Sequence, residues 1–358
     1  MIKKTFLAVI ILLVLVTACS TAPTPTQAPG PVTLTVMTHD SFAVSEEVVK
    51  AFEDEFDAKL VFLKSGDTGA ALNRAILMKE APEADVFYGV DNTFLSRAVQ
   101  EGVFESYTSP VLSDIPEEFT RGLSGVVTPI DYGDVCINYD RAWFAASGLA
   151  VPASLEDLTK PVYGSAQEVG LLVVENPATS SPGLAFLLAT ISEYGEDGYL
   201  DYWRSLKDNG VVVVNDWETA YYTNFSASSG QGLQPMVVSY ATSPAAEMIY
   251  ASEPLIEAPT ASILNPNTCF RQIEYAGILK GTKQLELAQR FIDFMLSPRF
   301  QEDMPLQMFV YPVNPQAALP EEFERYAAMA EEPAVLDPVL IANRREEWIR
   351  EWSEVMLK

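Results

Sequence analysis

The chain has 358 residues, of which 48% are hydrophobic and 20% are charged, and its formal net charge is −26. This acidity argues against nucleic acid as a partner, because phosphate binding requires clustered lysine and arginine. The length and the hydrophobic content are sufficient for a large buried core, and the length indicates two domains or lobes.

The N-terminal region has the pattern of an export signal followed by a tether. Two lysines precede an apolar run over residues 6–16, which is too short to span a membrane, and small residues then lead to Cys19. Bacterial lipoproteins have this arrangement, so we expect residues 1–18 to be a signal peptide and Cys19 to carry lipid. Residues 19–31, rich in Ser, Thr, Ala and Pro, should form a flexible tether. An ordinary signal peptide with an accidental cysteine is the alternative.

Strand and helix patterns then alternate three times over residues 32–101. Apolar residues that alternate with polar ones indicate strands, and apolar residues at helical spacing indicate the helices between them. This order predicts an α/β fold with a parallel sheet and helices on its faces. The predicted strands are 32–38, 59–63 and 84–90, and the predicted helices begin near Ser45, Ala70 and Asn92.

The segments that follow these three strands are rich in polar side chains or glycine. They read HDSF at residues 39–42, KSGDTG at 64–69 and GVDNT at 89–93. Ligands of open α/β sheets bind beyond the carboxyl ends of the strands. We therefore expect these segments to lie along one edge of the sheet and to contribute to a binding site.

A second α/β half begins near residues 130–133. It repeats the alternation of apolar strands with helices, but no internal sequence repeat is evident. Two amphipathic helices are expected towards the C-terminus. The predicted strands are 170–174, 211–214 and 236–240, and the predicted helices are 184–194, one that opens near Trp217, 285–296 and 346–357.

Hydroxyl side chains precede a proline at two strand-to-helix junctions of this half. Ser180 and Ser181 stand before the helix at 184–194, and Thr242 and Ser243 follow the strand that ends at Tyr240. Hydroxyls and free backbone N–H groups at a helix start can hold an anion or a carbonyl group. A Ser-Pro pair also caps helices that bind nothing, so the motif alone has moderate weight.

Three aromatic residues are expected in loops or at a helix start, namely Trp217, Phe309 and Tyr311. Large aromatic side chains in loops are often packing residues. They also form the usual walls of a pocket for a flat organic ligand, and a cation gains further from their faces.

Enzyme chemistry has little support in this sequence. His39 is the only histidine, and no H-E-x-x-H, paired C-x-x-C or P-loop motif occurs. We therefore expect no catalytic residue, no metal and no other cofactor, although a pair of acids for sugar hydrolysis remains open. The adjacent Tyr221 and Tyr222 are oxygen donors suited to ferric iron, but neighbours on a helix point about 100° apart.

The two remaining cysteines, Cys136 and Cys269, leave two alternatives open. An extracytoplasmic setting would allow them to form a disulfide. Both also lie in apolar, strand-like surroundings, where a free thiol is common.

Taken together, these motifs resemble the substrate-binding proteins of bacterial thiamine ABC transporters, within the larger class of two-lobed periplasmic-type binding proteins. The likeness runs from about Val32 to the C-terminus. Some marks, such as the strand that begins ADV, are shared with sister families for iron, polyamines and phosphonates. The combination of THDSF at 38–42, GVDN at 89–92, SYATSP at 239–244 and YPV at 311–313 is narrower and indicates thiamine.

The resemblance implies a type II periplasmic-binding-protein-like fold, in which two α/β lobes joined by crossing strands close over a ligand in a central cleft. We expect lobe 1 to comprise residues 32–125 plus 244–305, and lobe 2 residues 126–243 plus 306–358. The protein would be a monomer, anchored outside the cytoplasm, that passes thiamine or a thiamine phosphate to an ABC permease. Ferric iron, a polyamine or an aminophosphonate are the competing ligands, and a surface hydrolase is the distant alternative.

The resemblance also carries functional roles to individual positions. His39 stands where the family has an aromatic residue that stacks on the ligand, and Phe309 replaces a stacking tryptophan. Asp67 matches a carboxylate that accepts a hydrogen bond from the aminopyrimidine, and Trp217 matches a tryptophan of the same region. The hydroxyls expected at the hydroxyethyl or phosphate end are Ser180 and Ser181, and the other cleft residues are Tyr240, Thr242 and Ser243.

Overall fold

The structure, a computed structural model, describes residues 30–123, 125–164, 170–230 and 232–358. The predicted signal peptide, the lipid-bearing Cys19 and most of the tether lie outside the described residues, so these predictions stay untested. Residues 32–358 fold as one compact unit.

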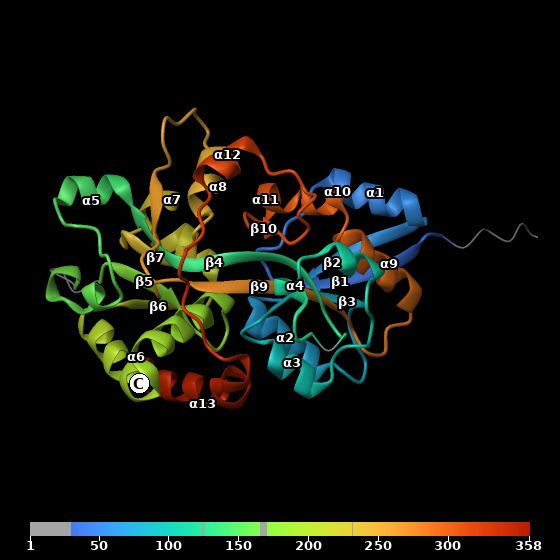
Figure 1. The fold of residues 1–358 in the computed structure, drawn as a ribbon, viewed down its shortest axis with the longest axis horizontal. Coiled ribbons are helices and arrows are strands. Elements are labelled where there is room, and N and C mark those ends of the chain that lie inside the picture. Colours follow the sequence, from blue (N-terminus) through green and yellow to red (C-terminus); the bar gives the residue numbers. More distant parts are fainter. Residues whose placement is uncertain (1–29, 124, 165–169, 231) are drawn as a thin grey trace, which may run out of the picture. The chain divides into compact units, whose positions relative to one another are not determined.

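One mixed sheet of ten strands runs through the described residues. Its order is β2-β1-β3-β9-β4-β7-β5-β6, and β8 and β10 also pair with β4 (Figure 1). The bounds are β1 Val32–Thr38, β2 Ala58–Lys64, β3 Val86–Asp91, β4 Thr128–Asp140, β5 Leu172–Glu175, β6 Val212–Val214, β7 Met236–Tyr240, β8 Thr260–Ile263, β9 Phe270–Ile278 and β10 Tyr311–Pro312.

The helices that connect these strands agree with most of the predicted ones. The first half contains α1 Glu46–Phe56, α2 Thr68–Leu77, α3 Leu95–Glu101 and α4 Glu117–Thr120. The remaining α-helices are α5 Arg141–Ser147, α6 Ser181–Asp208, α7 Ser226–Ser229, α8 Ser243–Ile249, α9 Leu285–Met295, α10 Pro298–Gln301, α11 Met304–Gln307, α12 Glu321–Tyr326 and α13 Pro338–Met356. The short turns η1 Pro110–Asp114, η2 Glu156–Thr159 and η3 Pro161–Tyr163 are 3₁₀-helical, and η4 Thr219–Asn224 is π-helical.

The sheet consists of two parallel halves that two long strands join. The strand β1 is parallel to both β2 and β3, as predicted, and β5 is parallel to β6 and β7. Between them β4 and β9 are antiparallel to each other and to their other neighbours, and Figure 1 shows both crossing the middle of the molecule. This is the two-lobed α/β architecture with crossing strands that the sequence led us to expect, while the exact lobe boundaries stay a prediction.

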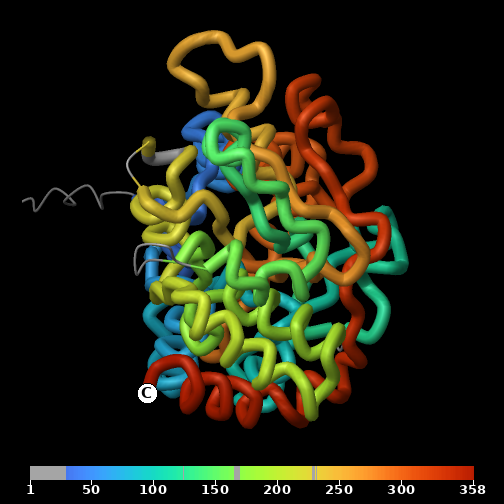
Figure 2. Tube along the Cα trace, turned by 90° about the vertical axis from the view of Figure 1, so that its left-hand side faces the viewer, coloured from blue at the N-terminus to red at the C-terminus, as the bar shows by residue number. Residues whose placement is uncertain are grey.

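Helices cover both faces of this sheet. One apolar core lies between the sheet and α2, α6 and α13, and a second lies on the other face against α1 and α9. The C-terminal helix α13 packs beside α6, as Figures 1 and 2 both show, and its Trp352 meets Trp203 of α6 edge to face at 5.4 Å. The predicted apolar face of this helix is therefore buried.

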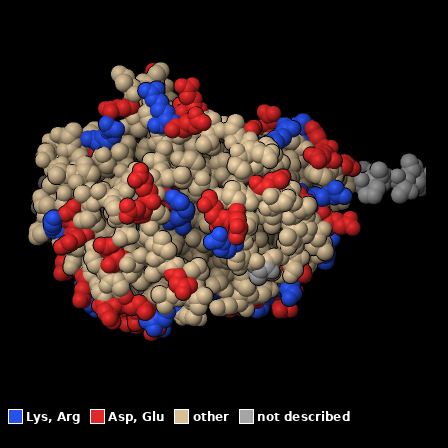
Figure 3. Space-filling model, in the orientation of Figure 1, with Lys and Arg blue, Asp and Glu red and all other residues tan. Residues whose placement is uncertain are grey.

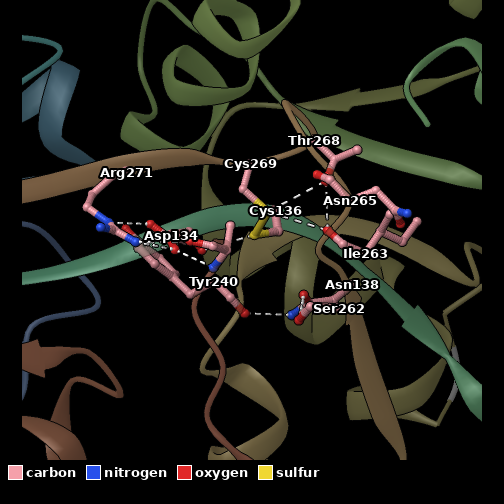
Figure 4. The surroundings of a disulfide bond; sticks show 11 residues. Asp134, Cys136, Asn138, Tyr240, Ser262, Ile263, Asn265, Thr268, Cys269 and Arg271 are labelled. Atoms are coloured by element: carbon pink, nitrogen blue, oxygen red, sulfur yellow. Dashed lines mark hydrogen bonds and ion pairs between the residues drawn. A yellow bond between two sulfur atoms is a disulfide. The ribbon is translucent and has the colours of Figure 1, made fainter. Parts of the chain in front are cut away.

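A disulfide links Cys136 on β4 to Cys269, just before β9. Both cysteines are fully buried, and Ala241 and Ala330 belong to the same small apolar cluster. Figure 4 shows the bond close to Arg271, whose guanidinium donates two hydrogen bonds to the Asp134 carboxylate at 2.8 and 3.0 Å. Of the two alternatives for these cysteines, the structure therefore has the paired one.

The surface is mixed in charge on the face that Figure 3 shows, where basic side chains are scattered among acidic ones and form no single patch.

Within the described residues, every helix is too short or too polar to serve as a transmembrane span.

Candidate ligand-binding cleft

A cavity of about 220 Å³ lies beyond the carboxyl ends of β1 and β7, where the first turns of α2, α6 and α8 meet. Its lining combines aromatic rings, hydroxyls and carboxylates. Two of the predicted site residues, Ser180 and Thr242, lie behind the lining. The other seven line it: His39, Asp67, Ser181, Trp217, Tyr240, Ser243 and Phe309. The structure thus brings together residues that are up to 270 positions apart in the chain, whereas their roles towards a ligand stay predictions.

His39 follows β1 directly and is 7% exposed. Gly89 of β3 makes room for its ring, because a Cβ atom at Gly89 would lie 2.5 Å from His39 Cδ2, and Gly89 has a φ of +102°. The Nε2 atom of His39 lies 3.4 Å from Glu274 Oε1. Burial lowers the pKa of His39, although the nearby carboxylates of Asp67 and Asp131 oppose the effect. The imidazole is therefore neutral at neutral pH and offers a flat ring.

Asp67 connects the two halves of the cleft. It is the N-cap of α2, where its Oδ1 accepts the backbone N–H of Thr68 at 2.8 Å. Its Oδ2 accepts the backbone N–H of Trp217 at 3.3 Å. Burial raises the pKa of Asp67, and His39, the Ser180 hydroxyl and these N–H donors oppose the effect. One carboxylate therefore positions the tryptophan and faces the cavity.

Trp217 opens a helical stretch, as predicted, which continues as the π-helical turn η4 from Thr219. Its ring stacks on Tyr221 with centroids 5.0 Å apart and an interplanar angle of 17°. Its Nε1 donates to Ser239 Oγ at 2.9 Å, and that oxygen lies 3.0 Å from Ser243 Oγ. The hydroxyl of Ser243 therefore takes part in holding the tryptophan ring as well as lining the cavity.

Phe309 has a left-handed backbone, with a φ of +56°, which is costly for a bulky residue. The hydroxyl of Thr242 donates a hydrogen bond to the Phe309 carbonyl, and the Phe309 N–H donates to Met304 O at 3.0 Å. Thr242 is fully buried. Its direct role in the structure is therefore to hold the loop that presents the phenylalanine ring.

The start of α6 reaches the cavity through Ser181 and Pro182. Ser180 occupies the N-cap position, is fully buried and lies one layer behind. The Ser181 hydroxyl donates to the carboxylate of Asp91 at the end of β3. This bond links the helix start of one half to a strand end of the other.

Several residues of this lining were not predicted from the sequence, above all Glu274 on β9. Burial raises the pKa of Glu274 to about 8. The available signal was a glutamate among apolar residues in the stretch EYAGIL. The structure also adds Tyr221 and Tyr222 to the lining.

The two adjacent tyrosines have different surroundings, because Tyr221 is buried and Tyr222 is about half exposed. The hydroxyl of Tyr221 donates to Glu247 Oε1 at 2.6 Å, and burial raises the pKa of both Tyr221 and Tyr222. Among the described residues, no group of three or more His, Cys, Asp or Glu side chains is placed to hold a metal ion.

The family model for bacterial extracellular solute-binding proteins matches residues 81–330 of the chain. The thiamine-binding periplasmic protein of Escherichia coli (strain K12) is 31% identical over 327 residues, which cover 90% of this chain and 93% of that protein. The protein of the same name from Brucella suis is 30% identical and covers 89% and 91%.

Solved structures agree with this similarity. A periplasmic thiamin binding protein superposes with a TM-score of 0.79 and 30% identity, covering 91% of this chain and 96% of that one. Iron-bound HitA from Pseudomonas aeruginosa superposes with a TM-score of 0.72 at 22% identity, covering 90% and 99%, which supports the fold alone.

Proposed function

This chain belongs to the bacterial extracellular solute-binding proteins, and from this premise we propose that it binds thiamine in the cleft and delivers it to an ABC permease. The observation that carries the proposal is the composition of the lining, in which stacked aromatic rings face carboxylates and hydroxyls in one cavity. Thiamine has a cationic thiazolium, an aminopyrimidine with hydrogen-bond donors and a polar tail. Aromatic faces and carboxylates attract the cation, and the carboxylate of Asp67 suits the amino group.

Within this proposal the predicted site residues take two kinds of role. His39, Trp217, Tyr240 and Phe309 form walls for the two flat rings, and Asp67 accepts the hydrogen bond of the aminopyrimidine. Ser181 and Ser243 are placed for the hydroxyethyl end. Behind them, Ser180 and Thr242 support the helix start and the Phe309 loop. Closure of the lobes about the crossing strands β4 and β9 would trap the vitamin.

We place the protein outside the cytoplasm as a monomer that a lipid on Cys19 holds at a membrane. Its relatives are named periplasmic, which supports the extracytoplasmic location. Replacement of Cys19 by Ala should move the protein from the membrane fraction to the soluble fraction. Retention of the variant in the membrane fraction would contradict the lipid anchor.

Native mass spectrometry of the protein as purified tests the proposed function, because a trapped vitamin identifies itself by its mass. Titration of the vitamin-free protein with thiamine should also change the fluorescence of Trp217, and this change should be absent from Trp217→Phe. A protein that carries no vitamin and shows neither heat nor fluorescence change with thiamine would overturn the proposal. Ferric iron added in parallel should produce no tyrosinate colour.

A further inference from the structure

Three carboxyl groups lie side by side across the strands beneath the cleft. In the sheet register, Glu274 of β9 is opposite Asp91 of β3 on one side and opposite Asp131 of β4 on the other. Residues directly opposite in antiparallel strands project to the same face. Glu274 is 4% exposed and the two aspartates are fully buried, and of the three only Glu274 lines the cavity.

The hydrogen bonds around Glu274 indicate that Glu274 and Asp131 together hold a proton when the cleft is empty. The Tyr88 hydroxyl lies 2.6 Å from Asp131 Oδ2 and 3.2 Å from Glu274 Oε2. Tyrosine has one hydroxyl hydrogen, so Tyr88 cannot donate to both carboxyl groups at once. Both contacts are satisfied only when Glu274 or Asp131 supplies a second hydrogen.

The other groups around Glu274 offer no positive charge. His39 lines the same cavity with its neutral ring, and its Nε2 has no hydrogen-bond partner among the described residues. No lysine or arginine is among the described residues that line the cavity. The titratable groups that face Glu274 are His39 after β1, Asp67 at the start of α2, Tyr88 and Asp91 on β3, Asp131 on β4 and Tyr240 on β7.

Neighbouring buried carboxyls cannot all ionise, because each charge is poorly solvated and repels the next. Consistent with this, burial raises the pKa of Glu274 to about 8 and that of Asp131 well above its ordinary value. The charges of Asp91 and Asp67 add to the rise at Glu274, and hydrogen bonds from Asp131 and Tyr88 oppose it. A cation in the cavity lowers the pKa of the neighbouring carboxyl, because an opposite charge favours the ionised carboxylate. The carboxyl can then lose its proton.

We propose that Glu274 is the residue that gives the cleft its preference for a cation, and that its carboxyl releases a proton to solvent as thiamine binds. The protonated carboxyl and the thiazolium cation become a carboxylate–thiazolium pair, and the proton leaves to water, so charge and atoms balance. This inference rests on the proposed function and adds to it a proton exchanged for each vitamin bound.

Calorimetry at pH 7 in two buffers of different ionisation enthalpy measures the proton directly. A group with a pKa of about 8 should release close to one proton per thiamine at this pH. The affinity should increase by up to about tenfold per pH unit between pH 6 and 8 and level off above. A neutral isostere, with carbon in place of the thiazolium nitrogen, should bind at least about tenfold more weakly and release no proton.

Variants then assign the proton to its residue. Glu274→Gln should abolish the proton release and flatten the pH dependence, whereas Glu274→Asp should retain part of both. Glu218→Gln is the matched control, because Glu218 also lines the cavity but is exposed at its rim. It should weaken binding slightly and leave the proton count unchanged.

Thiamine binding without proton release in the native protein would overturn the inference and leave the proposed function intact. Unchanged release in Glu274→Gln would also overturn it. If that variant fails to fold, the proton count of the native protein and the comparison with the neutral isostere still decide the question. Failure of thiamine to bind at all would instead contradict the proposed function.

Discussion

The two sides of the cleft are held by different parts of the fold. The acidic floor, which consists of Asp91, Glu274 and Asp131, lies on three adjacent strands and is fixed by backbone pairing on both sides. The aromatic wall consists of Trp217, just before a π-helical turn, and Phe309 on a loop, and a few hydrogen bonds position the two residues. We therefore expect substitutions near the floor to change stability and pH dependence, and substitutions in the wall to change affinity with less effect on folding.

The strongest test of a rigid floor is Gly89→Ala on β3. The new Cβ would lie 2.5 Å from His39 Cδ2, and alanine would also have to adopt a φ of +102°. Overpacking and left-handed strain each cost about 1–3 kcal/mol, so the free energy of unfolding should fall by about 3 kcal/mol or more in urea denaturation. Gly102→Ala is the matched control, because Gly102 has a φ of +64° and no neighbouring atom within 4 Å. If the free energy of unfolding falls equally in the two variants, the structure around His39 adjusts to the new methyl group and the floor is not rigid.

The wall is tested by Trp217→Ala, which removes the ring stacked on Tyr221. Large aromatic anchors contribute most to binding, so the affinity for thiamine should fall about 100-fold, or about 2.7 kcal/mol, in calorimetry. Trp217→Phe should retain part of the affinity. Trp143→Ala, on α5 outside the lining, should leave the affinity unchanged, and a similar loss there would show that the effect is general.

The acidic floor also predicts how stability depends on pH in the ligand-free protein. The folded pKa of Glu274 is raised to about 8, so its contribution is present at low pH and is lost as the pH rises through that value. His39, whose pKa is lowered, acts in the opposite direction below its ordinary value of 6.5. The free energy of unfolding should therefore fall by about 2 kcal/mol between pH 6.5 and 9. Buried Asp131 and Glu175, whose pKa values burial also raises, act in the same direction, so Glu274→Gln should reduce the fall without removing it. Urea denaturation across this range measures the fall, and a rising curve would contradict the assignment.

Asp67 belongs to both sides, and Asp67→Asn removes its charge and one of its two acceptor oxygens. The amide oxygen can still accept the Thr68 N–H and cap α2, so the fold should be retained, whereas the amide NH2 cannot accept the Trp217 N–H. The loss of a charged hydrogen-bond acceptor should weaken thiamine binding by about 1.5 kcal/mol in calorimetry. Asp40→Asn, which changes a nearby exposed carboxylate that accepts the Gly66 N–H, is the control. If both variants bind equally well, the carboxylate of Asp67 has no contact with the ligand.

The same division explains which features could be predicted from sequence. His39 and Asp67 follow strands whose local pattern is clear, and the rule that ligands bind at strand ends identified both positions. Glu274 lies on a crossing strand whose neighbour in the sheet is more than 140 residues away, so no local pattern reveals what faces it. The resemblance supplied the crossing strands but not the pairing of one carboxyl with the next.

Thr242 shows the corresponding limit within the wall. A hydroxyl before a proline at a helix start has the same sequence pattern whether it binds a ligand or a loop carbonyl. In the structure it donates to the carbonyl of Phe309 and is fully buried. Only the position of a residue 67 places further along the chain distinguishes the two roles.

The variant with the smallest expected effect, Thr242→Val, tests whether Thr242 acts on the ligand through Phe309. Thr242→Val removes the hydrogen bond to the Phe309 carbonyl and should weaken thiamine binding about fivefold, close to 1 kcal/mol, with recovery in Thr242→Ser. If Thr242 acts through Phe309, its loss should matter little once the ring has been removed by Phe309→Ala, so the two changes should not be additive in a double-mutant cycle. Additive losses would mean that Thr242 contacts the vitamin independently, as its place in the SYATSP motif predicts.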